Sequence, residues 1–250
     1  MMDSPCHRSY LPLHELPLSV RVLYTATLVI LGMGYMFALV YVFASYAGRD
    51  GNPSSLSAQD IAIAYGGSKE GTRLEAALKG PMRGMLPADE INAIIAWVHR
   101  GADRRGYEKE IKPIIDKRCL ICHDGSNPHI PNLKGYDNVV KVLEFDRGTD
   151  VFTLVRVSHI HLFGLTFIFF IVGLIFSHAQ VRPAWLKGVV IAAPFVAIFA
   201  DVGSWYFTKL YNPFAWVVML SGALMALCFA YMWVMSIYQM WFYRTPAHTV

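Results

Sequence analysis

Two cysteines and a histidine form a compact group of chemically reactive residues, Cys119-Leu120-Ile121-Cys122-His123. Each thiol at this spacing can add to one vinyl group of a haem, and the adjacent imidazole can bind the iron. The chain has four cysteines and nine histidines in 250 residues. Chance then predicts roughly 0.002 matches to C-x-x-C-H. The motif therefore predicts one covalent haem c, with Cys119 and Cys122 as attachment points and His123 as iron ligand.

A zinc site or a disulfide is the structural alternative for the same two cysteines. Structural zinc needs four ligands in tetrahedral spacing. Only His129 lies near the motif, while Cys6 and Cys228 belong to distant segments. The spacing favours haem over zinc.

The composition indicates a membrane protein. Hydrophobic residues make up 55% of the chain, charged residues 16%, and the mean hydropathy is +0.38. The apolar residues gather in one early run and in nearly everything after residue 153, leaving a polar insert between them. The net charge of +4 comes without a long basic run, so nucleic acid is excluded as a partner.

The apolar runs predict four transmembrane helices, at 19–46, 154–177, 186–208 and 214–242. The expected organisation is a tail (1–18), the first membrane helix (19–47), a polar domain (48–153), a three-helix membrane bundle (154–243) and a second tail (244–250). The fold class is all-α, with the small helical domain inserted between the first and second membrane helices.

The insert shows signals for several short helices. Ser57 with Asp60 forms a capping box at one helix start, and residues 72–79 read as a second helix. A methionine-bearing loop with Met82 and Met85 precedes a helix that ends at Gly101. His99, near that end, is expected on the surface, where its charge complements the helix dipole.

This segment resembles the closing part of class I cytochromes c, with Met82 or Met85 followed by Asp89-Glu90 and Ala96-Trp97-Val98. Residues 107–125, which hold the C-x-x-C-H motif, resemble the opening part of that family. The order is reversed, because in the family the haem motif comes first. The resemblance implies a monohaem cytochrome c-like domain whose sixth iron ligand is Met85, with Met82, His129 and His161 as alternatives. Methionine ligation would raise the reduction potential and histidine would lower it.

Four crossings place both ends of the chain on one side of the membrane. Basic residues flank the helix ends assigned to that side, and the positive-inside rule then makes it cytoplasmic; they are Arg8, Arg21, Arg182, Lys187 and Arg244. The haem domain is expected outside, in the periplasm, where the cytochromes that it resembles acquire their haem. The expected location is the bacterial inner membrane.

The predicted membrane helices contain two histidines and one acidic residue, His159, His161 and Asp201. Such residues are costly in lipid and mark candidate functional sites. One interpretation is a quinone or proton site, and the other is interfacial packing beside Trp205, Tyr206 and Tyr211. Residues two apart on a helix differ by about 200° in direction, so the two histidines cannot serve one flat ligand. A b-type haem is not expected within this chain.

Three functions remain open from the sequence. The first is single-electron transfer between subunits of a membrane redox complex and a periplasmic electron carrier. The second is quinol oxidation with His159 or His161 and Asp201. The third is a non-catalytic haem sensor or assembly subunit. The sequence does not decide between an electron-transfer protein and a subunit of an oxidoreductase.

Overall fold

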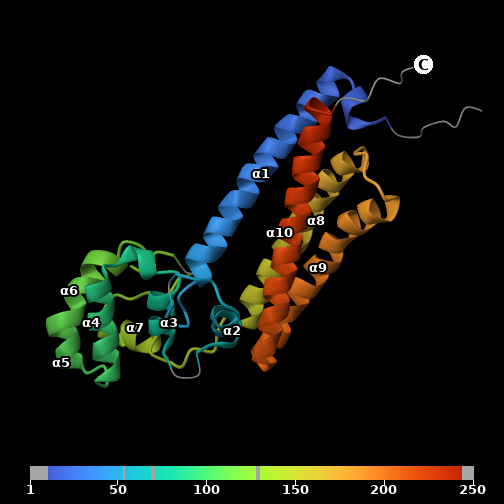
Figure 1. The fold of residues 1–250 in the computed structure, drawn as a ribbon. Helices are drawn as coiled ribbons and strands as arrows, with labels where there is room; N and C mark the ends of the chain where they lie inside the picture. Colours follow the sequence, from blue (N-terminus) through green and yellow to red (C-terminus); the bar gives the residue numbers. More distant parts are fainter. Residues whose placement is uncertain (1–10, 53, 69–70, 128–129, 244–250) are drawn as a thin grey trace, which may run out of the picture. The chain divides into compact units, whose positions relative to one another are not determined.

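The computed structural model describes residues 11–52, 54–68, 71–127 and 130–243. Apart from one isolated β-bridge, between Thr72 and Phe145, regular secondary structure in these residues is helical (Figure 1). Four described helices are long and apolar enough to cross a membrane; they are α1 (Leu18–Tyr46), α8 (Val151–Ser177), α9 (Ala184–Leu210) and α10 (Ala215–Trp241). A helix of 27 residues is about 40 Å long and exceeds the ~30 Å hydrocarbon core. The predicted all-α class and the four membrane helices are confirmed for the described residues, and the largest difference in bounds is at α8, predicted from residue 154.

The chain forms two compact units. The first comprises Met1–Leu39, Leu154–Trp205 and Trp216–Val250, and the second comprises Val40–Thr153 and Tyr206–Ala215. The second unit therefore takes in the link between α9 and α10 together with the polar insert. We call the first the membrane unit and the second the inserted unit.

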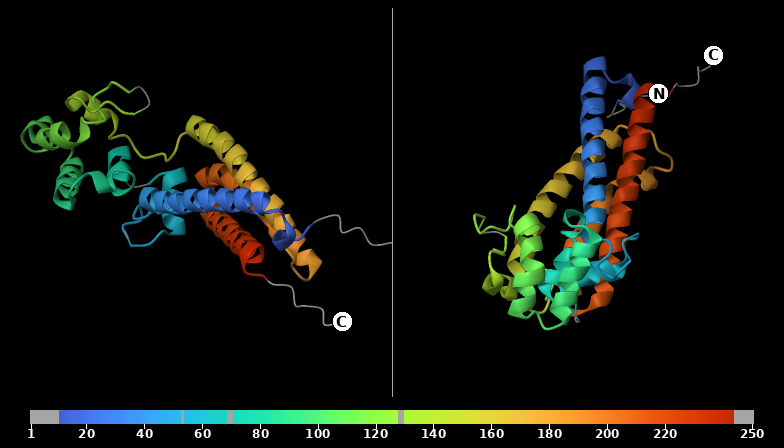
Figure 2. Two further views of the ribbon diagram at one scale, coloured as in Figure 1. Left: turned by 90° about the horizontal axis from the view of Figure 1, so that it is seen from above. Right: turned by 90° about the vertical axis from the view of Figure 1, so that its left-hand side faces the viewer.

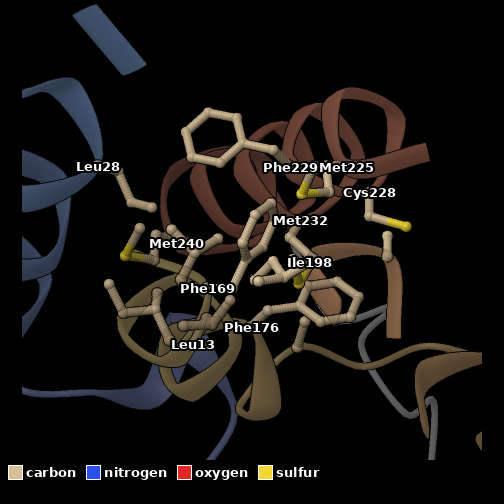
Figure 3. Packing of buried hydrophobic residues seen from close by; sticks show 14 residues of the cluster. Leu13, Leu28, Phe169, Phe176, Ile198, Met225, Cys228, Phe229, Met232 and Met240 are labelled. Carbon is tan, nitrogen blue, oxygen red and sulfur yellow. The ribbon is translucent and has the colours of Figure 1, made fainter. Parts of the chain in front are cut away.

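The core of the membrane unit joins side chains from all four long helices. Phe169 and Phe176 on α8 pack with Met232 on α10, Leu28 on α1 and Ile198 on α9 (Figure 3). The Phe169 and Phe176 side chains are 1% and 0% exposed. Helices that are apolar all round hold one another through such van der Waals packing, because lipid gives no hydrophobic advantage to association.

Helices α1 and α10 approach each other closely within this unit. The indole N–H of Trp233 donates to the carbonyl oxygen of Leu28 at 2.7 Å, and Tyr35 stacks on Phe229 with ring centroids 4.3 Å apart. An ideal Cβ on Gly32 would lie 3.0 Å from Nε1 of Trp233. A small residue at this position therefore allows the indole to reach the backbone of α1.

Two of the basic residues predicted to share a side, Arg21 and Lys187, lie at helix starts in the membrane unit, while Arg8 and Arg244 lie outside the described residues. The Arg21 guanidinium donates to the carbonyl oxygen of Met240 and lies 4.2 Å from the centre of the Trp241 ring. The Lys187 ammonium donates to the carbonyl oxygens of Ser177 and Ala179. The first turn of α1 thus lies beside the last turn of α10, and the first turn of α9 lies beside the end of α8.

The inserted unit is built from short helices with strong start signals. Ser57 and Thr72 each form a full capping box, with Asp60 for α2 (Ala58–Gly66) and with Glu75 for α3 (Arg73–Lys79). After the short helix η2 (Arg83–Met85), α4 (Ala88–His99) runs beside residues 104–119 (Figure 2). The predicted helix starts near 57 and 72 are confirmed.

The two ends of the insert are joined backbone to backbone. Residues 142–149 run along residues 64–74, with hydrogen bonds such as Leu74 N to Val142 O and Thr149 N to Ala64 O, both 3.0 Å. Gly67 and Gly148 meet where the two segments cross. Both have positive φ, and an ideal Cβ on either would lie 2.1–2.2 Å from a carbonyl oxygen of the other segment. Only glycine fits at this crossing.

A lysine from the end of α9 secures the same crossing. The ammonium of Lys209 donates to three backbone carbonyl oxygens, those of Tyr65 at 2.9 Å, Arg147 at 3.0 Å and Thr149 at 2.6 Å. A lysine has three donors, and here all three are used. Residues 206–215 therefore belong structurally to the inserted unit.

Candidate functional site

The segment that carries the C-x-x-C-H motif is a continuous helical stretch with two widened parts. It begins with α5 (Arg104–Gly106), capped by Asp103, whose carboxylate accepts the Gly106 N–H at 2.9 Å. Two π-helical turns follow, η3 (Tyr107–Ile111) and η4 (Ile115–Cys119), separated by α6 (Lys112–Ile114). Pro113 lies in this stretch and cannot donate a backbone hydrogen bond, which favours the wider winding.

A stripe of residues four apart anchors this stretch to α4. Tyr107, Ile111 and Ile115 are at most 1% exposed and pack with Trp97 in one hydrophobic cluster. Cys119 is the next position in the series and packs against the same cluster. Burial raises the pKa of the Cys119 thiol to about 11, with a smaller contribution from the Glu90 charge. The sequence thus places Cys119 where the apolar stripe ends and Cys122 one turn later, in the open.

An ion pair fixes α4 beside the cysteines. The Arg118 guanidinium donates twice to the Glu90 carboxylate, from Nε at 2.9 Å and from Nη2 at 3.2 Å. Paired hydrogen bonds of this kind define both distance and orientation. Glu90 is in the first turn of α4, so this end of α4 is tied to the residue just before Cys119.

The motif itself folds into a tight turn. The backbone N–H groups of Cys122 and His123 both donate to the carbonyl oxygen of Cys119, at 3.1 and 2.8 Å. Cys119 is half-buried, Cys122 is exposed, and both thiols are free. Exposure of Ile121 reaches 77%. Neither attachment residue is engaged in a disulfide.

The following loop holds the imidazole of His123. Its Nδ1 lies 2.7 Å from the carbonyl oxygen of Pro131, and the Leu133 N–H donates to the His123 carbonyl oxygen at 2.9 Å. Leu133 is 5% exposed and belongs to the cluster that contains Trp97. A carbonyl next to Nδ1 selects the tautomer with its proton there, which leaves Nε2 as a lone-pair donor.

The candidate sixth ligands occupy different surroundings. Met85, in η2, is 67% exposed, and Met82 is half-buried. Leu86, directly after Met85, packs against the cluster that receives Cys119. His129 lies outside the described residues, and His161 belongs to the membrane unit.

The membrane unit brings two of the three intramembrane candidates to one indole. Trp205 Nε1–H donates to Oδ1 of Asp201 at 3.4 Å, and the Trp205 ring meets the His161 ring edge to face, with centroids 5.0 Å apart. Asp201 is 7% exposed. His161 Nδ1 lies 3.0 Å from the carbonyl oxygen of Val157. His159 is exposed and turned away from this group, as the predicted 200° separation requires.

Sequence reasoning missed two residues of these sites, Pro131 and Tyr107. The Pro131 carbonyl carries no side-chain signal and depends on how the loop returns. The sequence predicts Trp205 beside the intramembrane His and Asp residues, and its place four residues after Asp201 puts the two side chains on one helix face. Tyr107 could have been found as the start of the four-residue series that ends at Cys119.

One of three comparisons with known proteins found a match, and it covers the membrane part of the chain. Residues 144–247 match the model of one family, Aq_1264_TM, described as a transmembrane helical domain. No curated protein and no solved structure matches the chain. In the described residues, no three His, Cys, Asp or Glu side chains converge as ligands for a metal ion. The match and the four long helices define a multi-pass membrane protein.

Proposed function

We propose that this protein is a membrane-anchored monohaem c-type cytochrome, which passes single electrons between a membrane redox complex and a periplasmic carrier. The hydrogen bond between His123 Nδ1 and the Pro131 carbonyl is the observation that carries this proposal. Metal-binding histidines are typically held in this way through the ring nitrogen that does not bind the metal. A C-x-x-C-H histidine with no metal to bind would have no need of a fixed tautomer.

The donor set fits one covalent haem. Cys119 and Cys122 would hold it through thioether bonds, and Nε2 of His123 would bind the iron. When bound, the haem iron takes up and releases one electron. The chain's own residues orient the imidazole, leave both thiols outside any disulfide and so available for attachment, and present the exposed Cys122 to a partner.

A buried hydroxyl in the same domain has no hydrogen-bond partner, which supports a bound group that would supply one. Tyr107 is 1% exposed, and its Oη makes no hydrogen bond in the part of the chain that the structure describes. Buried hydroxyls without a partner are rare, because losing water costs about 1–3 kcal/mol. A haem carboxylate would be a suitable acceptor for this hydroxyl.

The proposed orientation has both ends of the membrane unit's chain in the cytoplasm and the haem in the periplasm. Arg21 and Lys187 lie at the end of the unit where α1 begins. Positively charged residues are retained on the cytoplasmic side. The insert leaves α1 at the opposite end, which supports a periplasmic haem domain and a bacterial inner-membrane location.

Covalent haem attachment is tested in the full chain expressed together with a c-type maturation system. The wild type should show peroxidase staining on a denaturing gel and one haem per chain by the pyridine assay. The Cys119→Ala/Cys122→Ala variant should lose both signals. Cys228→Ala is the matched control, because this buried cysteine lies in the membrane unit and should leave the haem in place. A wild-type chain that matures without any covalent haem would reject the proposal.

A second candidate function is quinol oxidation, favoured by the contact of Trp205 with both Asp201 and His161. A quinol gives up two protons and two electrons on oxidation. His161 would accept one hydroxyl proton, with Asp201 orienting the indole of Trp205 against it, and the second proton would leave to water at the membrane surface. The haem and a redox partner would each take one electron, which leaves the quinone.

Quinol-dependent haem reduction tests this second function. Asp201→Asn and His161→Ala should each slow the reduction by about 100-fold, the lower range for loss of a general acid or base. His159→Ala is the matched control, since this neighbour is exposed and lies outside the group. Equal rates in all three variants and the wild type would leave simple electron transfer as the function.

A further inference from the structure

A basic cavity lies in the inserted unit, beside the first residues that follow α1. Its volume is ≈260 Å³, and its wall includes Gly48, Gly51, Lys79 and Arg83. No acidic side chain lines it. The ammonium of Lys79 and the guanidinium of Arg83 are both exposed, and neither makes an ion pair among the described residues. The cavity therefore presents positive charge without an anion of its own.

A third cation, Arg49, directly follows the wall residue Gly48 in the chain; it does not line the cavity itself, and it lacks a full set of partners. Its guanidinium packs against Gly80, where an ideal Cβ would lie 3.0 Å from Nε and from Cζ. One Nη donates to the Ser45 carbonyl oxygen at 3.2 Å, but the buried Nε–H bonds to nothing in the described chain. Burial lowers the pKa of Arg49, partly offset by Tyr46 and nearby carboxylates. An unsatisfied, buried guanidinium N–H is costly unless a ligand accepts it.

The nearby carboxylates do not serve as that acceptor. Asp60 accepts the N–H of Asp50 at 2.8 Å and the N–H of Ser57 at 2.9 Å. Asp146 accepts the N–H groups of Ser68 and Gly148, at 3.0 and 2.9 Å. Both carboxylates are committed to the backbone, and Arg49 forms no ion pair with either in the described residues.

The remaining wall of the cavity is apolar. Leu78, Ile91 and Ile95 line it from α3 and α4. A phosphate bears several acceptor oxygens and pairs well with arginine. A phospholipid combines such a phosphate with an apolar glycerol ester region. Arg49 follows the last residue of α1, Tyr46, by three positions, which is where a membrane helix meets the headgroups.

We propose that Lys79 and Arg83 bind the phosphate of an anionic phospholipid headgroup in this cavity, with the charge of Arg49 behind its wall. The lipid neutralises the basic wall and covers the apolar side chains of α3 and α4. Neither lysine nor arginine of this wall belongs to the segment 119–133, and Arg83 lies in η2, between Met82 and Met85.

Lipid titration of the purified full chain in neutral detergent tests the site. The probes are phosphatidylglycerol, phosphatidylcholine and inorganic phosphate, and the readouts are bound lipid by native mass spectrometry and the shift in Tm. Phosphatidylglycerol should bind more tightly than phosphatidylcholine and raise Tm. Loss of two charges in Lys79→Gln/Arg83→Gln should weaken phosphatidylglycerol binding by roughly 20-fold.

A matched control removes the same two kinds of charge elsewhere in the inserted unit. Arg105→Gln/Lys109→Gln changes exposed side chains that lie outside the cavity and should bind phosphatidylglycerol like the wild type. Equal binding by the two double variants would overturn the proposal, as would equal affinity for phosphatidylcholine. A Tm shift from inorganic phosphate alone that matches the lipid shift would assign the site to free phosphate and reject the lipid.

Discussion

The imidazole of His123 is held by the backbone of Pro131, with Nδ1 2.7 Å from the carbonyl oxygen. Eight residues separate the two, and the loop between them returns so that Leu133 enters the hydrophobic cluster beneath the cysteines. The ring is thereby presented with its other nitrogen free.

The two thiols should differ in reactivity in the haem-free protein. Cys122 is exposed, whereas burial raises the pKa of Cys119 to about 11. At pH 8 only about one thousandth of Cys119 would be thiolate, the form that reacts. Iodoacetamide should therefore modify Cys122 first, and the rate at Cys119 should rise about tenfold per pH unit up to about pH 11. Peptide mass spectrometry at several pH values measures both rates; equal rates at pH 8 would contradict the burial of Cys119.

Replacement of the proposed methionine ligand should change the spectrum of the proposed haem. We expect Met85→Leu to remove the near-infrared charge-transfer band of the oxidised protein and to lower the reduction potential, because thioether ligation stabilises the reduced iron. Met82→Leu tests the alternative, and Met225→Leu, in the core of the membrane unit, is the control. A band that persists in both loop variants would place the methionine ligand outside this loop, and a wild type without the band would leave His129 or His161 as the ligand.

The ion pair between Glu75 and His99 should stabilise the inserted unit in a pH-dependent way. His99 Nε2 lies 2.6 Å from Oε1 of Glu75, a partner that the expected surface role of His99 did not include. Burial alone would raise the pKa of Glu75, but hydrogen bonds from Thr72 and His99 outweigh it and lower that pKa below 4.5.

A lowered carboxyl pKa contributes stability above the unfolded value and loses it as the pH falls through the folded value. Glu75→Gln should therefore cost about 1–3 kcal/mol at pH 7 and much less below pH 4. Thermal unfolding by circular dichroism at pH 7 and at low pH measures the two differences. A loss of unfolding free energy in Glu75→Gln that is the same at both pH values would show that the charge of Glu75 does not contribute to stability.

The crossing of Gly67 and Gly148 should tolerate no side chain. Gly67→Ala would place Cβ 2.1 Å from the carbonyl oxygen of Asp146, on top of the strain of a positive φ. We expect a loss of more than about 2 kcal/mol in unfolding free energy. Gly135→Ala shares the positive φ but has no atom within 4 Å of the added Cβ. The further loss of unfolding free energy in Gly67→Ala, compared with this control, therefore measures the effect of the close approach. A Gly67→Ala protein as stable as the control would disprove the crossing.

The packing of α1 on α10 should depend on Gly32. Alanine there would place Cβ 3.0 Å from Nε1 of Trp233, so the indole would have to move and its bond to Leu28 would weaken. We expect a loss of about 1 kcal/mol and a lower Tm in detergent. Gly34→Ala, two residues on with nothing within 4 Å, should be neutral or slightly stabilising because alanine favours helix. Equal Tm values for the two variants would argue against this contact.

The sequence by itself determined the features that depend on neighbours along the chain. The C-x-x-C-H spacing, the four apolar runs and the capping boxes at Ser57 and Thr72 are local patterns, and local geometry suffices to read them. The same periodicity separated His159 from His161, because a helix fixes the angle between residues two apart.

Only the tertiary structure decided which distant groups meet. The Pro131 carbonyl at His123, the Lys209 ammonium on three carbonyls, and Trp205 between Asp201 and His161 all depend on how helices and loops pack. Backbone carbonyls carry no residue signature, so no sequence pattern announces them as partners. Packing of the apolar faces decides which acceptors the buried polar groups can reach. These long-range contacts therefore depend on the complete fold.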